Sequence, residues 1–566
     1  MCGIAGFVGE GSPQELEKGI GLACRALAHR GPDDCRWVIR PDVALGATRL
    51  AIRDSLRGVQ PMETNGVTIV FNGELYGCEP LRKQLEQVGY VFKTQSDTEV
   101  FLYGFLEKGP AIFDQVSGMF ACGIWDEKEK KLYLARDRWG EKPLYYVAES
   151  AFIAFASEIK GLWGWPSIEQ EMQEEDVPGF LRRSYIAGPY TGWKKVRKLR
   201  AGSWLMWQAG KWSETSYFKP EVAKGKTNPE ALFEMVDLSV KECLVSDRPV
   251  GAFLSGGLDS STVAYFLSRH RPKAPVFSLH WNEKEYSEEE FTTAVAQALG
   301  LTHHSMLCDV KYFQEHFETI ARYYDEPFAD ESMVPTVCLA QFAKNWVDVV
   351  LTGDGADELF HGYERYFFPG SPVEYSDVFA ATSKASLQQI CHPDFLQNLC
   401  PEILCDGGRE RSSLDMTTYL PDDILAKVDR ATMSVALEAR APFLTKRVSE
   451  FALRCSLEDL VGPEGGKHIL RRAMQGKLLP KTLQRKKMGF GVPLAQWFRG
   501  PLHNWMRERL IDGSLKETGW FLMRGITELI QEHVSGQSNR ARSLLNLLVL
   551  EIWVRETAER FQIISH

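Results

Sequence analysis

The sequence predicts an α/β protein in two parts, a strand-rich first part and a second part built on a doubly wound parallel sheet with a helical end. Short apolar runs between turn signals fill the first 210 residues. After residue 229, short apolar strands alternate with longer amphipathic helices, which is the pattern of a parallel sheet covered on both faces. The 566 residues are 44% hydrophobic and 25% charged, a composition typical of folded globular chains.

In the first part, the strands are predicted from apolar runs at residues 67–71, 119–125 and 131–135. Two amphipathic stretches, residues 13–29 and 80–89, each begin near a proline, which suits the first turn of a helix. The stretch KPEVAKGKTNP is polar, rich in lysine and proline, and has no periodicity. We therefore expect a first domain over residues 1–210, a linker over 211–229 and a second domain over 230–566.

In the second part, the predicted strands alternate with predicted helices in chain order, and a mainly helical region follows after about residue 367. Ligands of such sheets bind at the carboxyl ends of the strands. The strands are expected at residues 250–254, 275–280 and 347–351, the helices at 260–268, 285–299 and 334–344, and a last long helix at 541–560.

Charge and composition exclude several classes of protein. The 66 basic residues are outnumbered by 75 acidic ones, so no overall positive field exists to hold nucleic acid or an anionic membrane. No uncharged apolar run reaches the roughly 18 residues that a membrane span needs, and we expect a cytoplasmic protein. The 12 cysteines form no CxxC pair or Cys/His cluster, which argues against a disulfide framework and a structural zinc site.

The second residue is a cysteine. Removal of Met1 would give Cys2 both a thiol and a free α-amine. Their pKa values are about 8.5 and 7.7–8.0, so the amine can take the thiol proton without a separate histidine. Cys2 is therefore a candidate nucleophile.

Two polar loops follow predicted strands of the second part. The loop Ser255-Gly256-Gly257-Leu258-Asp259-Ser260 lies between a strand and a helix, where glycines and helix-start N–H groups can cradle an anion. It lacks the GK[ST] ending of a Walker A loop. The run from Thr352 to Glu358 follows another strand and is acidic. Because Mg²⁺ is commonly held by one or two carboxylates plus substrate phosphates, Asp259 and Asp357 are candidate metal ligands.

The first 210 residues resemble the class II glutamine amidotransferase domain. The matching motifs are MCGIAGFVG, RALAHRGPDD, RLAIRD, FNGELYG, SDTEV, RDRWGEKPLYY and FASEIKGL, in the order of that family. The resemblance implies an αββα sandwich of the N-terminal nucleophile hydrolase type, with Cys2 attacking the side-chain amide of glutamine. It implies an oxyanion hole from Asn72 and Gly73, and glutamine binding by Arg49, Glu74 and Asp97.

The second part resembles the synthetase domain of glutamine-hydrolysing asparagine synthetases, which belongs to the ATP pyrophosphatases. The motifs are LSGGLDSS, PVFSLHW, YYDEPFADES, LTGDGADELFHGYERY, KVDRATMSVALEARAPFL and RKKMGFGVPL. The resemblance implies that ammonia crosses a tunnel between the domains and attacks an adenylated carboxylate, giving AMP and pyrophosphate. It also makes a homodimer plausible.

By this resemblance, each part of the ATP site falls on particular residues. Asp354 lies against nucleotide and acceptor, and Lys487 neutralises phosphate charge, with Lys486 as a competing assignment. The ATP-binding residues are Phe253 and Leu279 for adenine, Ser255, Gly256, Gly257, Asp259 and Ser260 for the phosphates, and Thr352 and Gly353 beside the nucleotide.

Several positions depart from the family pattern. Thr445 stands where an aspartate is usual, His361 where a glycine is usual, and Gly77 where an asparagine is usual, and the first two are expected to flank the acceptor region. Aspartate is the expected acceptor, but the identity of this carboxylate stays open. Sugar uronic acids and natural-product carboxylates are alternatives, as is a β-lactam-forming synthetase, which the intact Cys2 disfavours. A catalytically silent binding scaffold is the alternative of another class.

Overall fold

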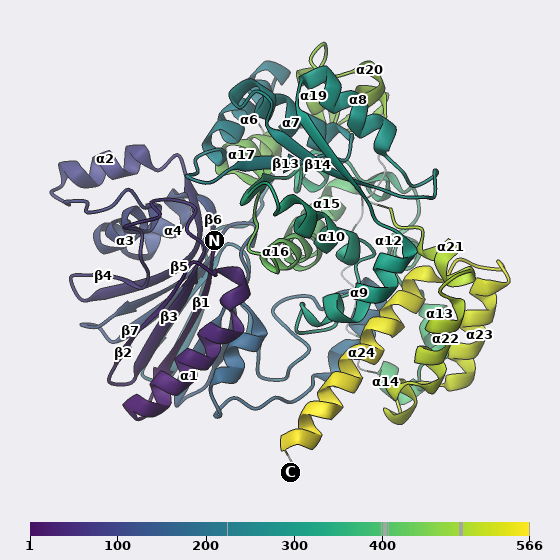
Figure 1. Ribbon diagram of the computed structural model, residues 1–566, viewed down its shortest axis with the longest axis horizontal. Helices are drawn as coiled ribbons and strands as arrows, with labels where there is room; N and C mark the ends of the chain where they lie inside the picture. The colour runs from purple at the N-terminus through teal and green to yellow at the C-terminus, as the bar shows by residue number, and fades with distance from the viewer. Residues whose placement is uncertain (223–224, 398, 400–404, 406, 486–490, 565–566) are drawn as a thin grey trace.

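The computed structural model describes residues 1–222, 225–397, 399, 405, 407–485 and 491–564. The N-terminal part is a layered body of strands, and the rest of the chain forms a parallel sheet with helices around it (Figure 1). The expected α/β class is therefore confirmed. In Figure 1 the long C-terminal helix α24 (Ala541–Ile564) runs diagonally down to the C-terminus at the lower edge of the view, and α2 (Glu79–Gln87) lies at the left.

The N-terminal part contains two six-stranded sheets in which every recorded strand pair is antiparallel. The order in the first sheet is β10 (Arg197–Lys198), β8 (Tyr145–Ala148), β9 (Phe152–Ala156), β1 (Cys2–Gly9), β3 (Val43–Arg49) and β2 (Asp34–Arg40). The order in the second sheet is β12 (Lys211–Ser216), β11 (Ser203–Gln208), β7 (Lys131–Arg136), β6 (Ser117–Asp126), β5 (Val67–Tyr76) and β4 (Met62–Thr64).

The two sheets pack face to face around Phe155. A side chain at Gly6 of β1 or at Gly123 of β6 would come within 2.3 Å of the Phe155 ring, so both strands need glycine there. The outer faces are covered by helices, because α1 (Pro13–Ala26) packs on the first sheet and α3 (Asp97–Lys108) on the second. This arrangement is the expected αββα sandwich.

Strand β12 lies inside the segment that was predicted as a linker. It pairs with β11 along its whole length, from Lys211 to Ser216. The sheet therefore continues past the predicted boundary at residue 210. The next helix, α6 (Pro229–Cys243), begins with Asn228 as its N-cap.

The second part is built on a five-stranded parallel sheet. Its strand order is β15 (Thr302–Leu307), β14 (Pro275–His280), β13 (Val250–Phe253), β16 (Val349–Leu351) and β17 (Glu438–Arg440). The chain moves outward from β13 to β15 and then returns to the other side of β13, so the topological switch point lies between β13 and β16. Ligand sites of open α/β sheets lie at such a point.

Helices cover both faces of this sheet, as a doubly wound fold requires. One face is covered by α7 (Leu258–His270) and α8 (Glu289–Leu299), the other by α10 (Met333–Ala343) and α16 (Leu425–Met433). The helical end includes α22 (His503–Asp512), α23 (Met523–Val534) and α24, which packs on α9 (Val310–Arg322).

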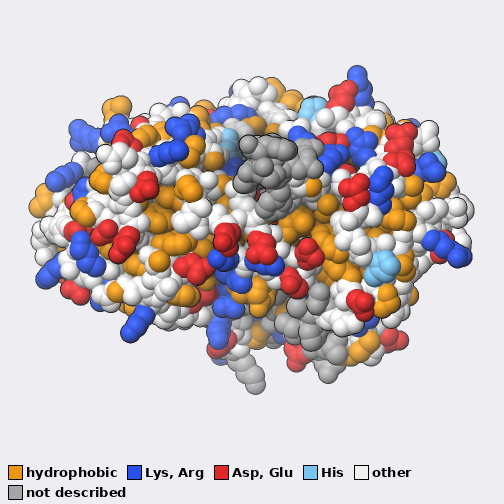
Figure 2. Space-filling view, turned by 90° about the horizontal axis from the view of Figure 1, so that it is seen from below, with side chains coloured by type: hydrophobic (Ala, Val, Ile, Leu, Met, Phe, Trp, Pro, Cys, Tyr) orange, Lys and Arg blue, Asp and Glu red, His pale blue; other side chains and the backbone are white. Residues whose placement is uncertain are grey.

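The surface and the helices add two observations. Basic and acidic side chains are interspersed over the face shown in Figure 2, where no single sign dominates. Among the helices in the described residues, none combines the length and the hydropathy needed to cross a bilayer.

Candidate functional site

Cys2 lies on β1, at the end of the first sheet that faces the second part. Its backbone N–H donates to Asn72 Oδ1 at 3.0 Å, and Gln60 Nε2 donates to its sulfur at 3.9 Å. Burial raises the pKa of the Cys2 thiol, and the neighbouring α-ammonium group opposes that rise. The thiol is thus protonated at neutral pH unless a base takes its proton.

Asn72 and Gly73 are placed close to Cys2 by strand β5. Asn72 Nδ2 is buried and has no hydrogen-bond partner among the described residues, so this donor is available to a ligand. A buried donor left unpaired costs free energy, and a ligand that accepts its hydrogen bond would remove that cost. At Gly73 a Cβ atom would lie 2.1 Å from the carbonyl oxygen of Met119, so no other residue fits there.

The three residues predicted to bind glutamine lie in two groups: Arg49 is next to Cys2, and Glu74 and Asp97 are next to each other. Arg49 is the register partner of Cys2, and its guanidinium donates to the carbonyls of Ser55 at 2.9 Å and Asp54 at 2.7 Å. Arg49 therefore holds the loop after β3 in this structure. Asp97 accepts from the Leu75 N–H at 2.8 Å, beside Glu74.

Glu74 is a strongly perturbed group. Burial and the negative charge of Asp97 raise its pKa well above the usual range, while Arg440 and Arg53 oppose the rise. The nearest guanidinium atoms lie 3.4 Å away on Arg440 and 3.8 Å away on Arg53. An ammonium group placed between Glu74 and Asp97 would relieve the repulsion between the two carboxylates.

Sequence reasoning missed Glu438 and Arg440, which reach this site from strand β17 of the second part. The Met1 α-ammonium donates to Glu438 Oε2 at 2.7 Å, and Arg440 Nε donates to Glu438 Oε1 at 2.6 Å. Both side chains are buried. On the other side of the strand, the Arg440 carbonyl accepts from the Thr352 N–H at 2.9 Å.

A second set of buried ion pairs fixes the two parts to each other. Arg30 Nη1 lies 2.7 Å from Glu158 and 2.8 Å from Asp429, and Arg430 lies 2.7 Å from Glu158 and 2.6 Å from Asp325. Arg30 and Glu158 belong to the first part, and the other three residues to the second. The interface therefore contains charges that are paired across it.

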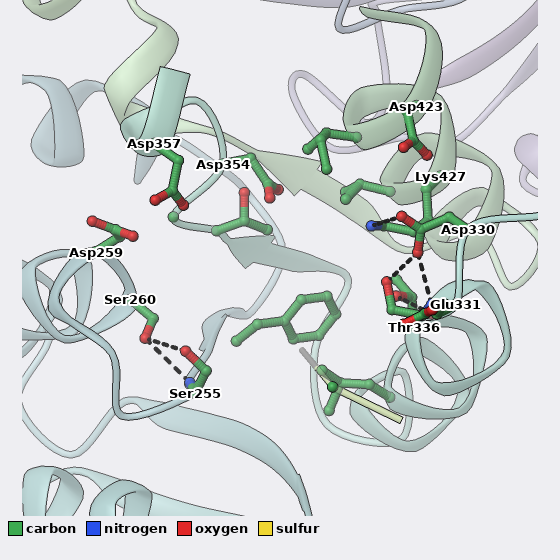
Figure 3. Close-up of a pocket in the computed structure, with 18 of the residues that line it drawn as sticks. Ser255, Asp259, Ser260, Asp330, Glu331, Thr336, Asp354, Asp357, Asp423 and Lys427 are labelled. Carbon is green, nitrogen blue, oxygen red and sulfur yellow. Dashed lines mark hydrogen bonds and ion pairs between the residues drawn. The ribbon is translucent and has the colours of Figure 1, made fainter. Parts of the chain in front are cut away.

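A cavity of about 500 Å³ opens at the carboxyl ends of β13, β14 and β16 (Figure 3). This is the position expected for a ligand of such a sheet. The cavity lining includes nine of the predicted residues: Phe253, Ser255, Asp259, Ser260, Leu279, Thr352, Gly353, Asp354 and Asp357.

The loop between β13 and α7 has the backbone that an anion cradle needs. Ser260 Oγ accepts from the Ser255 N–H at 3.2 Å, and the two hydroxyls lie 3.0 Å apart. Gly256 has φ of +68°, a left-handed conformation that favours glycine, and Gly257 is the N-cap of α7. The two glycines form the turn between Ser255 and the first residues of α7.

Lys467 lies between the two candidate metal ligands and was missed by sequence reasoning. Its Nζ is 2.5 Å from Asp259 Oδ2 and 2.6 Å from Asp357 Oδ1, and the residue is buried. Two carboxylates on one side of a phosphate loop fit the usual ligand set of Mg²⁺. No three His, Cys, Asp or Glu side chains in the described part of the chain are placed to bind a metal ion alone.

The remaining predictions for this site have different outcomes. Lys487 and Lys486 lie outside the described residues. His361 and Thr445 are not among the residues that line the cavity, and that they flank the acceptor region stays a prediction. Thr445 instead contacts Ser239, with 2.9 Å between the hydroxyls, and His361 is buried at the end of α11 (Ala356–Phe360).

Comparison with known proteins covers both parts of the chain. A family model described as glutamine amidotransferase domain matches residues 1–218, and one described as asparagine synthase matches residues 231–400 and 406–555. Asparagine synthetase (glutamine-hydrolyzing) 1 of Bacillus subtilis is 29% identical, over 98% of this chain and 96% of its own length.

Two further relatives also match most of this chain. Asparagine synthetase (glutamine-hydrolyzing) 3 of Bacillus subtilis is 30% identical over 94% of this chain and 98% of its own length. Amidase chry2 of Gibberella zeae is 25% identical over 92% and 93%. The resemblance that the motifs predicted is confirmed: this chain belongs to the asparagine synthase family and is an asparagine synthetase-like, glutamine-hydrolysing amidotransferase of the ligase class.

Proposed function

We propose that this enzyme releases ammonia from glutamine at Cys2 and uses it to amidate an adenylated carboxylate, with aspartate as the acceptor and asparagine, AMP and pyrophosphate as products. One observation carries the proposal. Strand β17 contacts the Met1 amine and Glu74 through its side chains, and contacts Thr352 of the ATP cavity through its backbone. Strand β17 thus contacts residues of both candidate sites.

The first reaction starts once Met1 has been removed. The α-amine of Cys2 takes the thiol proton, and the sulfur attacks the side-chain amide carbon of glutamine. The resulting α-ammonium gives that proton to the leaving nitrogen as the C–N bond breaks, which releases ammonia. The negative oxygen of the tetrahedral intermediate accepts hydrogen bonds from Asn72 Nδ2 and the Gly73 N–H. Water then cleaves the thioester to give glutamate.

Glutamine is held by opposite charges at its two ends. Glu74 and Asp97 bind the α-ammonium group, and Arg49 binds the α-carboxylate. For this role the Arg49 guanidinium must exchange at least one loop carbonyl for the substrate. Together these residues select a free amino acid.

The second reaction takes place in the cavity on the parallel sheet. Phe253 and Leu279 enclose the adenine, and Thr352 and Gly353 lie beside the nucleotide. The acceptor carboxylate attacks the α-phosphorus of ATP, and pyrophosphate leaves into the loop formed by Ser255, Gly256, Gly257 and Ser260. Ammonia then attacks the acyl carbon of the adenylate, AMP leaves, and Asp354 accepts a proton from the attacking nitrogen.

Three further groups compensate the phosphate charge. Asp259 and Asp357 would hold Mg²⁺, which would offset the charge of the phosphates when bound. Lys467 lies against both carboxylates and can move to the pyrophosphate, and Lys487 contributes from the segment after Arg485. The Arg485 guanidinium donates to the Ser255 carbonyl at 3.2 Å, so residue 485 itself contacts the loop between β13 and α7.

Passage of ammonia inside the protein keeps it unprotonated and separates both reactive intermediates from water. The apolar contact of Met1, Leu50, Met119 and Trp139 with residues of the second part supports a dry route. We further propose that the enzyme is cytoplasmic and that it forms a homodimer. Measurement of its molecular mass in solution tests the dimer.

The test is one incubation with glutamine, ATP and Mg²⁺, with and without aspartate, in which glutamate, AMP and asparagine are measured. Aspartate-dependent AMP and asparagine support the proposal. Glutamate without aspartate-dependent AMP would indicate another acceptor, such as a uronic acid. Absence of all three products would indicate a silent scaffold.

A further inference from the structure

Two cysteines of the first part lie side by side on the face of the first sheet that α1 covers. Cys24 is near the end of α1 and Cys35 is on β2, the edge strand of that sheet, and their thiols are hydrogen-bonded to each other. A Cβ at Gly46 of β3 would lie 2.6 Å from the Cys24 sulfur. Gly46 pairs with Trp37, which shares a face of β2 with Cys35, so the register of the sheet agrees with this contact.

The two thiols differ in their access to solvent. Of the eleven cysteines in the described part of the chain, Cys35 alone is exposed, whereas Cys24 is 1% exposed. Cysteines that respond to oxidants are typically accessible and lie beside a second, resolving cysteine. An oxidant from solvent thus reaches Cys35 first, and Cys24 is the adjacent thiol.

A second thiol pair provides a comparison within the same chain. The thiols of Cys308 and Cys338 are also hydrogen-bonded to each other. These residues are 0% and 1% exposed, so neither thiol of this pair is open to solvent. The two pairs share the contact and differ in exposure.

The segment between Cys24 and Cys35 contacts the proposed nucleophile. In this segment, Arg30 Nε donates to the Cys2 carbonyl at 3.2 Å. A second contact runs through Thr48, the register partner of Cys35, whose hydroxyl accepts from the Gly3 N–H at 3.2 Å. A change in the distance between α1 and β2 therefore acts on the backbone on both sides of the Cys2 side chain.

We propose that Cys24 and Cys35 form a reversible disulfide in the presence of a hydroperoxide, and that this bond slows glutamine hydrolysis at Cys2. The Cys35 sulfur attacks a peroxide oxygen and the O–O bond breaks, which gives a sulfenic acid and water. The Cys24 sulfur attacks the sulfenic sulfur, the S–O bond breaks, and the oxygen leaves as water with the Cys24 proton. Two thiols and one hydrogen peroxide thus give one disulfide and two waters, and a thiol reductant reverses the reaction.

The thiols favour a slow response to the oxidant. Burial raises the pKa of Cys24 and, less completely buried, that of Cys35, although the hydrogen bond from Cys24 opposes the rise at Cys35. Because the thiolate is the reactive form, few molecules react at any moment near neutral pH. We therefore expect the disulfide to accumulate only under sustained exposure to peroxide.

The effect on activity follows from the shorter distance between bonded sulfurs. Sulfurs of a disulfide are about 2.05 Å apart, closer than those of two hydrogen-bonded thiols, so its formation draws β2 and the end of α1 together. We expect kcat/KM for glutamine hydrolysis to fall by about 10-fold or more, because a displacement of about 1 Å at a reacting group can cost about 100-fold. This effect rests on the proposed role of Cys2, whereas formation of the disulfide does not.

Peptide mapping tests the bond. The full chain is incubated with hydrogen peroxide, unfolded in the presence of N-ethylmaleimide, and digested with trypsin without reductant. We expect residues 19–25 and 31–36 to appear as one disulfide-linked species, and Cys308 and Cys338 to carry the maleimide. Absence of the Cys24–Cys35 link, or equally fast linkage of Cys308 to Cys338, would overturn the proposal.

Activity of matched variants tests the consequence of the bond. Peroxide should lower glutamine hydrolysis by the native enzyme, and dithiothreitol should restore it, whereas Cys35→Ser and Cys24→Ala should keep their activity under the same treatment. Direct oxidation of Cys2 would affect all three proteins alike, so an equal loss in the native enzyme and both variants would contradict the proposal. Full activity of native enzyme that carries the mapped disulfide would also contradict it.

Failure of the proposed function has a different signature. Reduced enzyme that hydrolyses no glutamine would refute the role of Cys2, and peptide mapping would still decide whether the Cys24–Cys35 disulfide forms. Active reduced enzyme without a peroxide-dependent disulfide would leave the amidotransferase reaction intact and refute only the proposed bond.

Discussion

The α-ammonium of Met1 is bonded to the carboxylate of Glu438 at 2.7 Å, and both groups are completely buried between the two parts of the enzyme. Burial opposes ionisation of Glu438, but the Met1 ammonium and Arg440 lower its pKa to about 2. The start of the chain is therefore held by a strand of the synthetase part. Once Met1 is removed, its buried volume and the Glu438 carboxylate face the new α-amine of Cys2.

The active enzyme is expected to begin at Cys2. An α-amine on the nucleophile is required to take the thiol proton, because burial raises the thiol pKa. The intact mass of glutaminase-active protein should be lower than that of the full chain by one methionine. A fully active preparation that retains Met1 would contradict the role of the Cys2 amine.

Replacement of Cys2 should separate the two reactions. Cys2→Ala should abolish glutamine-dependent synthesis and keep synthesis from added ammonium salt. The cavity for the second reaction is formed by the parallel sheet of the second part, away from strand β1 that carries Cys2. Cys122→Ala is a control, because Cys122 is a buried thiol in the same sandwich with no proposed role. Loss of ammonium-dependent synthesis in Cys2→Ala, with the control intact, would contradict separate sites.

The buried ion pairs around Glu158 should stabilise the contact between the first and second parts of the chain. Glu158→Gln leaves the guanidinium groups of Arg30 and Arg430 without one shared carboxylate, which should cost about 3–5 kcal/mol in the free energy of unfolding. Thermal or urea unfolding measures the loss. Glu171→Gln, which removes an exposed partner of Lys194, is the control and should change little.

The same ion pairs predict how the free energy of unfolding changes with pH. Burial opposes ionisation of Glu158, but Arg430, Lys160 and His29 lower its pKa well below the usual range. Its contribution is therefore complete above the unfolded value of about 4.3 and is lost as the pH falls below it. The stability difference between the native enzyme and Glu158→Gln should be constant near pH 7 and shrink below about pH 4.3. A difference that grows on acidification would contradict this ion-pair account.

Lys467 should act on the ATP reaction alone. Lys467→Met removes the positive charge between Asp259 and Asp357 and should lower kcat/KM for ATP by at least about 10-fold, with glutamine hydrolysis retained. Lys481→Met is the control, because that lysine is exposed and pairs loosely with Glu290. An unchanged ATP dependence in Lys467→Met would show that the lysine only balances buried carboxylates.

Local sequence signals were sufficient for the elements that place most of the candidate site. Strand β13 and the loop to α7 could be predicted because an apolar run leads into glycines and a helix start within a few residues. Cys2 and Asn72 could be predicted as candidate site residues, because each lies in a motif on a buried strand. Their closeness, 3.0 Å from the Cys2 N–H to Asn72 Oδ1, depends on the packing of two sheets.

Strand β17 shows why the rest could not be predicted. It has only three residues, Glu438, Ala439 and Arg440, and two charged residues in so short a stretch are typical of an exposed segment. They are buried because the first part of the chain supplies their partners, Met1 and Glu74, more than 360 residues earlier. A segment of such low β-propensity becomes a strand only in the assembled structure.

Lys467 was hidden for a similar reason, although one local signal precedes it. Gly465 and Gly466 indicate a tight backbone approach, and a Cβ at Gly466 would lie 1.7 Å from the His361 carbonyl oxygen. Lys467 itself has φ of +61°, an uncommon conformation for a residue with a side chain. That it reaches two aspartates of other loops depends on the tertiary fold.

The central claim is that ammonia made at Cys2 reaches the adenylate without entering the solvent. It is tested by supplying glutamine labelled with ¹⁵N at the side-chain amide together with an excess of unlabelled ammonium salt, and measuring ¹⁵N in the amide of the product. Internal transfer predicts that nearly all product made at saturating glutamine carries the label. Dilution of the label to the isotope ratio of the bulk ammonium pool would contradict it.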